Sequence, residues 1–142
     1  MKCLSVREPW ASAIPRLGRL GKDVENRSWR TTYRGPLLIH AGKATPTVGE
    51  WAVFDRVRRW AGVPRDDTAL VVMELAILRG ETLGRVLGRV DLVDVVRDSG
   101  SPWAAHGQYH WVLANPVVFE GPVAVSGRLG LFDVQGLEDI LP

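Results

Sequence analysis

The alternating pattern in the last third of the chain constrains the fold most. From Leu83 to Val96, apolar and polar residues alternate around Gly84 and Gly88. This pattern is typical of a long strand with glycine kinks, as found at barrel corners. Two more strand-like segments follow at 109–119 and 122–134, each bounded by Gly or Pro. Because no helical segment separates these strands, the pattern favours antiparallel pairing and disfavours a doubly wound parallel sheet.

The first two-thirds of the chain add helical segments and short strands. Residues 64–82 are rich in β-branched side chains, but their length and the N-capping residues Asp66 and Asp67 favour a helix over a strand. The last residues, 136–142, are expected to form a short turn or helix. The other predicted segments are strands over 2–6, 24–29 and 35–43 and helices over 8–18 and 47–62.

Together these segments predict an α+β fold in one domain over residues 1–142. We expect a small, mostly antiparallel β-barrel of about six strands, surrounded by about three helices. A chain of 142 residues is long enough for one domain with its own core.

Composition excludes several classes of protein. Hydrophobic residues make up 46% and charged residues 24% of the chain, which is typical of a globular protein. The single cysteine rules out a disulfide within the chain, and the three histidines lack the spacing of a helical zinc site, so we expect no metal and no cofactor. The longest apolar run, 69–78, is too short for a bilayer, and the N-terminus lacks the apolar stretch of a signal peptide. We therefore expect a cytoplasmic protein with no membrane contact.

The charge is distributed unevenly along the chain. Residues 1–65 carry a formal charge of +8 and residues 66–142 carry −6, although the whole chain carries only +2. A basic face made in this way would attract phosphates and polyanions. The alternative, ordinary scattered surface arginine, remains open at this point.

One short stretch, from Gly21 onwards, has the residues of a binding site. A strand has a side-chain period of two, so Glu25, Arg27 and Trp29 are expected on one face. A turn at Gly21 would bring Lys22 to the same place. Arginine suits a phosphate or a base edge, and tryptophan can stack on a base. Alternatively, the charges form a salt bridge that closes the barrel, and the tryptophan is part of the core.

Further candidates flank the strands. Arg7 follows the first strand, Arg34 precedes the third and Lys43 stands at its end. Each could contact a phosphate. Alternatively, Arg7 holds Glu25, and Arg34 and Lys43 are simply exposed. Trp103 lies in a loop between strands, where it could stack on a ligand or plug the barrel. His40 is expected to be a hydrogen-bonded histidine within the barrel.

The other aromatic residues are predicted mainly to pack. Trp51 and Trp60 follow the helical period and are expected to pack against the core, as is Trp10. Tyr109 and His106 could supply hydrogen bonds near the loop that contains Trp103.

Several sequence blocks occur in an order that resembles a known family. The chain is similar to the ASCH (activating-signal-cointegrator homology) family of the PUA-like superfamily, with residues 45–82 supported least. "GKDVENRSW" resembles the family's Lys-Glu-Arg signature, here with the glycine directly before the lysine. The other matching blocks are "LSVREPWASAI", "YRGPLLIHAGK", "GRVDLVDVV", "YHWVLANP" and "GRLGLFDV".

This resemblance implies a cleft over the signature and a link to RNA or nucleotides. Our main hypothesis is a domain that binds RNA or single-stranded nucleic acid in a nucleotide-sized cleft. Lys22, Arg27 and Lys43 would hold the nucleotide, with stacking on Trp103 or Trp29. Arg7 and Arg34 would be the remaining nucleic-acid contacts.

Two alternatives come from other classes. Glu25 and Lys22 could be catalytic in a metal-independent ribonuclease or in an enzyme acting on a modified nucleoside. A branch of the family that hydrolyses the amide of acetylated cytidine has threonine at the position of Glu25, which argues against that branch's mechanism here. In the second alternative, the signature is structural and the domain binds another protein.

Overall fold

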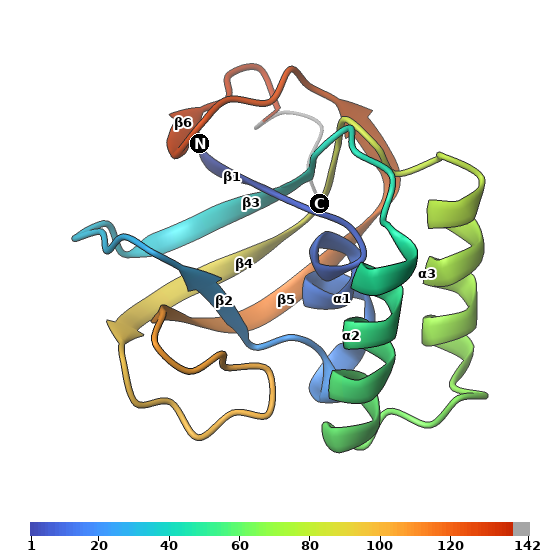
Figure 1. Ribbon diagram of the computed structural model, residues 1–142. Helices are drawn as coiled ribbons and strands as arrows, with labels where there is room; N and C mark the ends of the chain where they lie inside the picture. Colours follow the sequence, from blue (N-terminus) through green and yellow to red (C-terminus); the bar gives the residue numbers. More distant parts are fainter. Residues whose placement is uncertain (138–142) are drawn as a thin grey trace.

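The computed structural model describes residues 1–137 and contains six strands and three α-helices (Figure 1). Most of the turn or helix predicted for 136–142 lies outside the described residues. None of the described helices is long and apolar enough to cross a membrane. The elements are β1 (Lys2–Val6), α1 (Trp10–Arg16), the 3₁₀ turn η1 (Gly18–Leu20), β2 (Val24–Arg27), β3 (Gly35–Ala41), α2 (Val48–Trp60), α3 (Thr68–Leu78), β4 (Arg85–Val96), β5 (Tyr109–Ala124) and β6 (Leu131–Asp133).

The six strands form one curled sheet, a half-barrel, with the order β2-β5-β4-β3-β1-β6. Only the β1–β3 pair is parallel, and the other four pairs are antiparallel. The long β4–β5 pair has three register shifts, and such irregularities let a strand bend and twist more strongly. The α+β, PUA-like fold predicted from the sequence is therefore confirmed.

One prediction within the sheet is wrong. The segments 109–119 and 122–134 were expected to be two strands, but β5 runs without a break from Tyr109 to Ala124, and β6 has only three residues. Pro116 and Pro122 do not end β5, because β2 pairs with it only as far as Val112. Beyond that point one side of β5 is an edge, where proline's missing N–H costs no ladder hydrogen bond.

Side chains cap the starts of α2 and α3. Thr47 and Glu50 form a reciprocal capping box at the start of α2. The Asp67 side chain accepts a hydrogen bond from the backbone N–H of Leu70, which settles residues 68–78 as helix rather than strand. The first helix was expected over 8–18, and α1 covers Trp10–Arg16 within that range.

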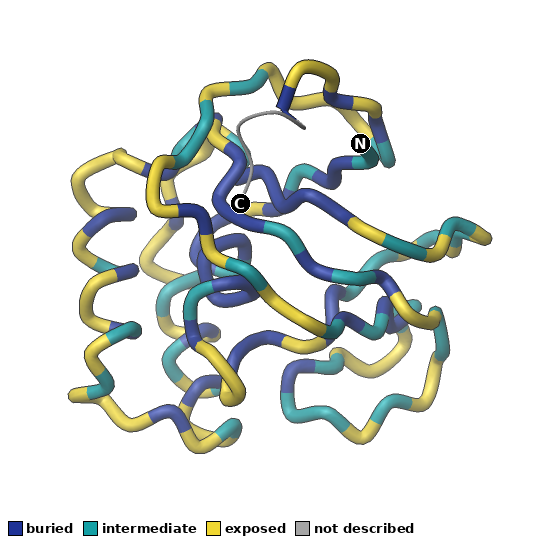
Figure 2. Tube along the Cα trace, turned by 180° about the vertical axis from the view of Figure 1, so that it is seen from behind, coloured by how far each residue is buried: buried dark blue, intermediate teal, exposed yellow. Residues whose placement is uncertain are grey.

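Helix α1 lies between the sheet and the other two helices (Figure 1). One apolar cluster joins α1 to the sheet around Trp111, and a second joins the three helices around Phe54. A third cluster contains Cys3, whose thiol has its pKa raised to about 12 by burial. Figure 2 shows exposed outward turns on α2 and α3, whereas most residues of β1 and β3 are buried.

A buried acid precedes α1. Glu8 is fully buried, and its carboxylate accepts hydrogen bonds from the backbone N–H of Ser12 at 2.8 Å and from the Ser12 hydroxyl at 2.6 Å. Burial disfavours the charged carboxylate and raises the pKa of Glu8 above its usual value of 4.5. The carboxyl group of Glu8 therefore binds its proton more tightly in the folded state than in the unfolded chain.

Substituting Glu8→Gln should change how stability depends on pH. With a raised pKa, the stability that Glu8 contributes is fully present below pH 4.5 and is lost as the pH rises through the folded-state pKa. We expect the variant to become more stable relative to the wild type as pH rises, as measured by thermal unfolding from pH 4 to 8. The exposed substitution Glu81→Gln is the control. Parallel pH curves for wild type and Glu8→Gln would contradict this account.

Candidate functional site

The three charged residues of the predicted signature meet in space. The Lys22 ammonium donates to Glu25 Oε1 at 2.6 Å and to the backbone carbonyl of Val24 at 2.6 Å. Arg27 Nε donates to Glu25 Oε2 at 3.0 Å. Lys22 and Glu25 are buried and Arg27 is half-buried. One carboxylate is thus shared by two cations, which leaves the cluster with a net charge of +1.

A turn after α1 brings Lys22 into this cluster, as the sequence predicted. The N–H of Gly21 donates to the carbonyl of Gly18, and the N–H of Lys22 donates to the carbonyl of Ala13. A Cβ at position 21 would lie 2.9 Å from the Gly18 oxygen and 3.0 Å from the Ala13 oxygen. Glycine is therefore needed here because the backbone comes too close for a side chain.

Arg27 also connects two parts of the sheet that are not neighbours. Its Nη2 donates to the backbone carbonyl of Ser5 in β1 at 2.7 Å. Strand β2 is one edge of the sheet, and β1 lies second from the opposite edge. The side chain therefore bridges the open side of the half-barrel, so a structural role exists beside any binding role.

The charged cluster lines a cleft of about 460 Å³. This volume is within the range of sites for small ligands. Helix α2 contributes an apolar wall of Val53, Val57 and Trp60, and the loop 102–105 contributes part of the lining. The cleft thus combines cations with an aromatic surface.

Trp60 is a cleft residue that the sequence reasoning missed. We predicted that it packs against the core, but 77% of it is exposed and it lines the cleft. The available signal is that Val53, Val57 and Trp60 recur at spacings of four and three residues. They form a second apolar stripe on α2, beside the one that buries Phe54. We assigned Trp60 to the buried stripe because helical period alone does not separate the two.

The loop wall of the cleft is held by Asn26. Its amide nitrogen donates to the carbonyl of Trp103 at 3.0 Å, and its amide oxygen accepts from the N–H of Ala105 at 2.8 Å. Trp103 lines the cleft, but only 4% of it is exposed, and its ring packs against Phe54 at 6.0 Å. It therefore offers little free surface for the stacking that the sequence suggested.

The expected position of Trp29 on the strand face of Glu25 is wrong. Strand β2 ends at Arg27, so Trp29 does not share a strand face with Glu25. Its ring instead packs edge-on against Trp111 with centroids 4.8 Å apart, and its carbonyl accepts a hydrogen bond from the Trp111 indole. Trp29 is not among the residues that line the cleft.

The three other predicted cations differ in position. Arg7 lines the cleft and donates two hydrogen bonds of 2.8 Å to Glu50, a pairing that lowers the pKa of Glu50 to about 2. Arg34 and Lys43 do not line the cleft. Lys43 is exposed beside Gly84, and Arg34 lies in the connection that precedes β3.

His40 is buried and hydrogen-bonded, as the sequence predicted. Its Nε2 lies 2.7 Å from the carbonyl of Val125, and its Nδ1 lies 3.0 Å from the Ser5 hydroxyl. A carbonyl can only accept, so this geometry assigns the ring proton to Nε2 and makes the hydroxyl a donor to Nδ1. Among residues 1–137 there is no cluster of three side chains that could hold a metal ion.

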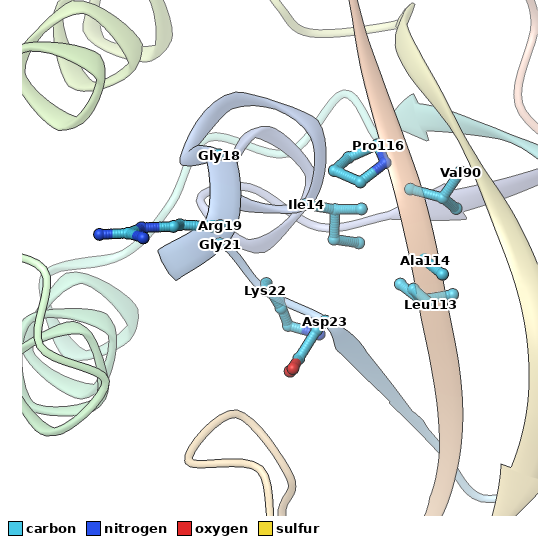
Figure 3. A pocket seen from close by; sticks show the side chains of 10 residues that line it. All are labelled: Ile14, Gly18, Arg19, Gly21, Lys22, Asp23, Val90, Leu113, Ala114 and Pro116. Atoms are coloured by element: carbon cyan, nitrogen blue, oxygen red, sulfur yellow. The ribbon is translucent and has the colours of Figure 1, made fainter.

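A second pocket, of about 340 Å³, lies between α1 and the strands β4 and β5 (Figure 3). Its walls are mainly apolar, including Ile14, Val90 and Leu113. The Arg19 side chain points away from these residues (Figure 3). The cleft over the charged cluster is therefore the better candidate for a polar ligand.

The curled sheet, the inserted α1 and the charged cleft together define an α+β domain of the PUA-like class. The family model for the ASCH domain matches residues 4–123, and the chain therefore belongs to the ASCH domain family. Activating signal cointegrator 1 from Homo sapiens is 35% identical over 101 residues, which cover 65% of this chain. The match spans only 14% of that larger protein.

Proposed function

We propose that this domain binds single-stranded RNA or another single-stranded nucleic acid and takes one nucleotide into the cleft. The observation that carries the proposal is that the cleft contains both the Arg27 guanidinium and the exposed ring of Trp60. Membership of the ASCH family supports it, because the sequence resemblance implies a link to RNA.

Arg27 and Trp60 make different kinds of contact with the nucleotide in this proposal. Arg27 uses Nε and Nη2 for Glu25 and Ser5, while its Nη1 has no partner among residues 1–137. That nitrogen can donate to a phosphate oxygen or to the acceptor edge of a base. Trp60 supplies an aromatic face on which a base can stack, an interaction open to every base.

The same geometry does not favour the enzyme alternative. Both oxygens of Glu25 already accept hydrogen bonds from cations, so acting as a general base would require breaking one of them. Catalysis by Glu25 and Lys22, and a modified nucleoside as ligand, remain predictions from the sequence.

Arg27→Ala should weaken RNA binding about tenfold or more, because it removes a charge-assisted contact in the cleft. We expect the slope of log affinity against log salt to fall by about one for the lost phosphate contact, or to stay unchanged if Arg27 contacts a base. The measurement is fluorescence anisotropy with a labelled random-sequence RNA of 12 nucleotides at several salt concentrations.

Two controls accompany this experiment. Arg27→Lys keeps the charge but loses the planar fork, so it should retain the salt slope while losing affinity. Arg128→Ala removes an exposed arginine of the β5–β6 connection and should leave binding unchanged. If the folded wild type binds no oligonucleotide, or binds independently of salt, the proposed function is wrong.

A further inference from the structure

Another concave surface, separate from the cleft and from the apolar pocket beside α1, is lined by cations and hydroxyls. It encloses about 700 Å³, and none of the residues that line it is acidic. We call it the arginine pocket. Its lining contains three arginines, two threonines and a tyrosine, namely Arg30, Arg34, Arg97, Thr31, Thr32 and Tyr109. Such a set consists of hydrogen-bond donors with positive charge, which is the chemistry that recognises phosphate.

The arginines are partly held in place while keeping donors free. The Arg97 guanidinium lies 4.5 Å from the centre of the Tyr109 ring. Arg34 Nη1 donates to the carbonyls of Thr31 and Tyr33 at 2.8 and 2.9 Å. These contacts use only part of the donor capacity of either side chain.

Little negative charge neutralises this surface. Arg34 Nη2 lies 3.6 Å from a carboxylate oxygen of Asp94, a long contact between two exposed groups. Such a surface pair is worth little and is readily exchanged. Arg30 and Arg97 form no ion pair with any of residues 1–137. The pocket therefore retains most of its positive charge for a ligand.

The arginine pocket begins where the cleft ends along β2. Tyr109 is the register partner of Arg27 across the β2–β5 pair. Arg30 follows Arg27 by three residues, so their Cα atoms lie within about 10 Å. A ligand that contacts Arg27 in the cleft can therefore continue over the end of β2 into the arginine pocket.

We propose that the arginine pocket binds phosphates of the same single strand whose nucleotide occupies the cleft. This inference rests on the proposed function and deepens it, because it makes an oligonucleotide rather than a mononucleotide the natural ligand. Phosphate contacts of this kind position a strand without reading its sequence. The planar Arg97 guanidinium against Tyr109 also gives a flanking base a surface to stack on.

The test compares a long and a short RNA. In the double variant Arg30→Gln and Arg97→Gln, two cations are lost while neither residue lies in the cleft. We expect affinity for the labelled 12-nucleotide RNA to fall at least tenfold, and the salt slope to fall by about two. Affinity for a dinucleotide, which is too short to fill both sites, should change less than twofold.

The matched control is Arg128→Gln, which removes one exposed charge far along the chain in the β5–β6 connection. If the double variant binds the 12-nucleotide RNA like this control while Arg27→Ala weakens it, the arginine pocket is not a phosphate site and the proposed function stands. If the wild type binds neither RNA, both proposals fall. Equal affinity for heparin and RNA, lost together in the double variant, would show a general polyanion surface and overturn the proposal. Circular dichroism and thermal unfolding confirm that each variant is folded.

Discussion

Glu25→Ala should lower the free energy of unfolding by about 3–5 kcal/mol, the typical cost of removing one partner from a buried ion pair. The side chain of Lys22 is only 3% exposed, and within residues 1–137 its one acidic partner is the carboxylate of Glu25, at 2.6 Å. The substitution leaves that ammonium buried without a counter-charge, and Arg27 loses one of its anchors as well. For a chain of 142 residues, we expect the melting temperature to fall by roughly 10 °C.

Thermal and denaturant unfolding measure this effect, and Asp133→Ala is the control. Asp133 pairs with Lys2 at 3.1 Å on the surface, where such a pair contributes about 0–1 kcal/mol. A loss of stability for Glu25→Ala no greater than that of the control would mean that the buried cluster does not hold the half-barrel together. RNA binding by the folded fraction of Glu25→Ala then shows whether Glu25 is purely structural or also contributes to binding.

Trp60→Ala should weaken RNA binding by about 1–3 kcal/mol, or roughly 5- to 150-fold, because it removes the exposed stacking surface of the cleft. Stability should change by less than about 0.5 kcal/mol, since Trp60 is already 77% exposed to solvent. Fluorescence anisotropy measures the first effect and thermal unfolding the second.

Two variants sharpen this experiment. Trp60→Phe keeps an aromatic ring and should retain most of the affinity. Leu129→Ala removes a fully exposed apolar side chain elsewhere and should change neither binding nor stability. Affinity of Trp60→Ala equal to that of the wild type would exclude stacking on this residue.

The strand pattern predicted much of the fold because burial on one face of a sheet imposes an alternation that survives in the sequence. The strands β1 to β4 were found in this way, and the three helices were found from helical spacing and capping residues. The continuous strand β5 was not, because the pattern places a strand boundary at Gly121 and Pro122. Only the pairing shows that Pro116 and Pro122 lie beyond the short partner β2. Sequence patterns carry no information on where a neighbouring strand stops.

The site was predicted unevenly for a similar reason. Lys22, Glu25 and Arg27 were found together because turn chemistry and strand period are local properties. The environments of two tryptophans were not predicted. Trp103, a candidate for stacking, is nearly buried, whereas Trp60, expected to pack against the core, is exposed. Exposure of a tryptophan depends on which elements cover it, and that depends on tertiary packing rather than on helical period or loop position.

Strand β2 has only four residues, yet the side chains on its two faces contribute to two different parts of the cleft, the charged cluster and the loop wall. Glu25 and Arg27 belong to the charged cluster, while Asn26 between them fixes the loop wall through two hydrogen bonds. The charged cluster and the loop wall are thus both attached to one short strand instead of to two independent loops. A ligand would find a preorganised cleft and lose little affinity to ordering the protein. Binding and release of a nucleotide should then need no rearrangement of the protein. We therefore expect the association rate to be that of two preformed surfaces.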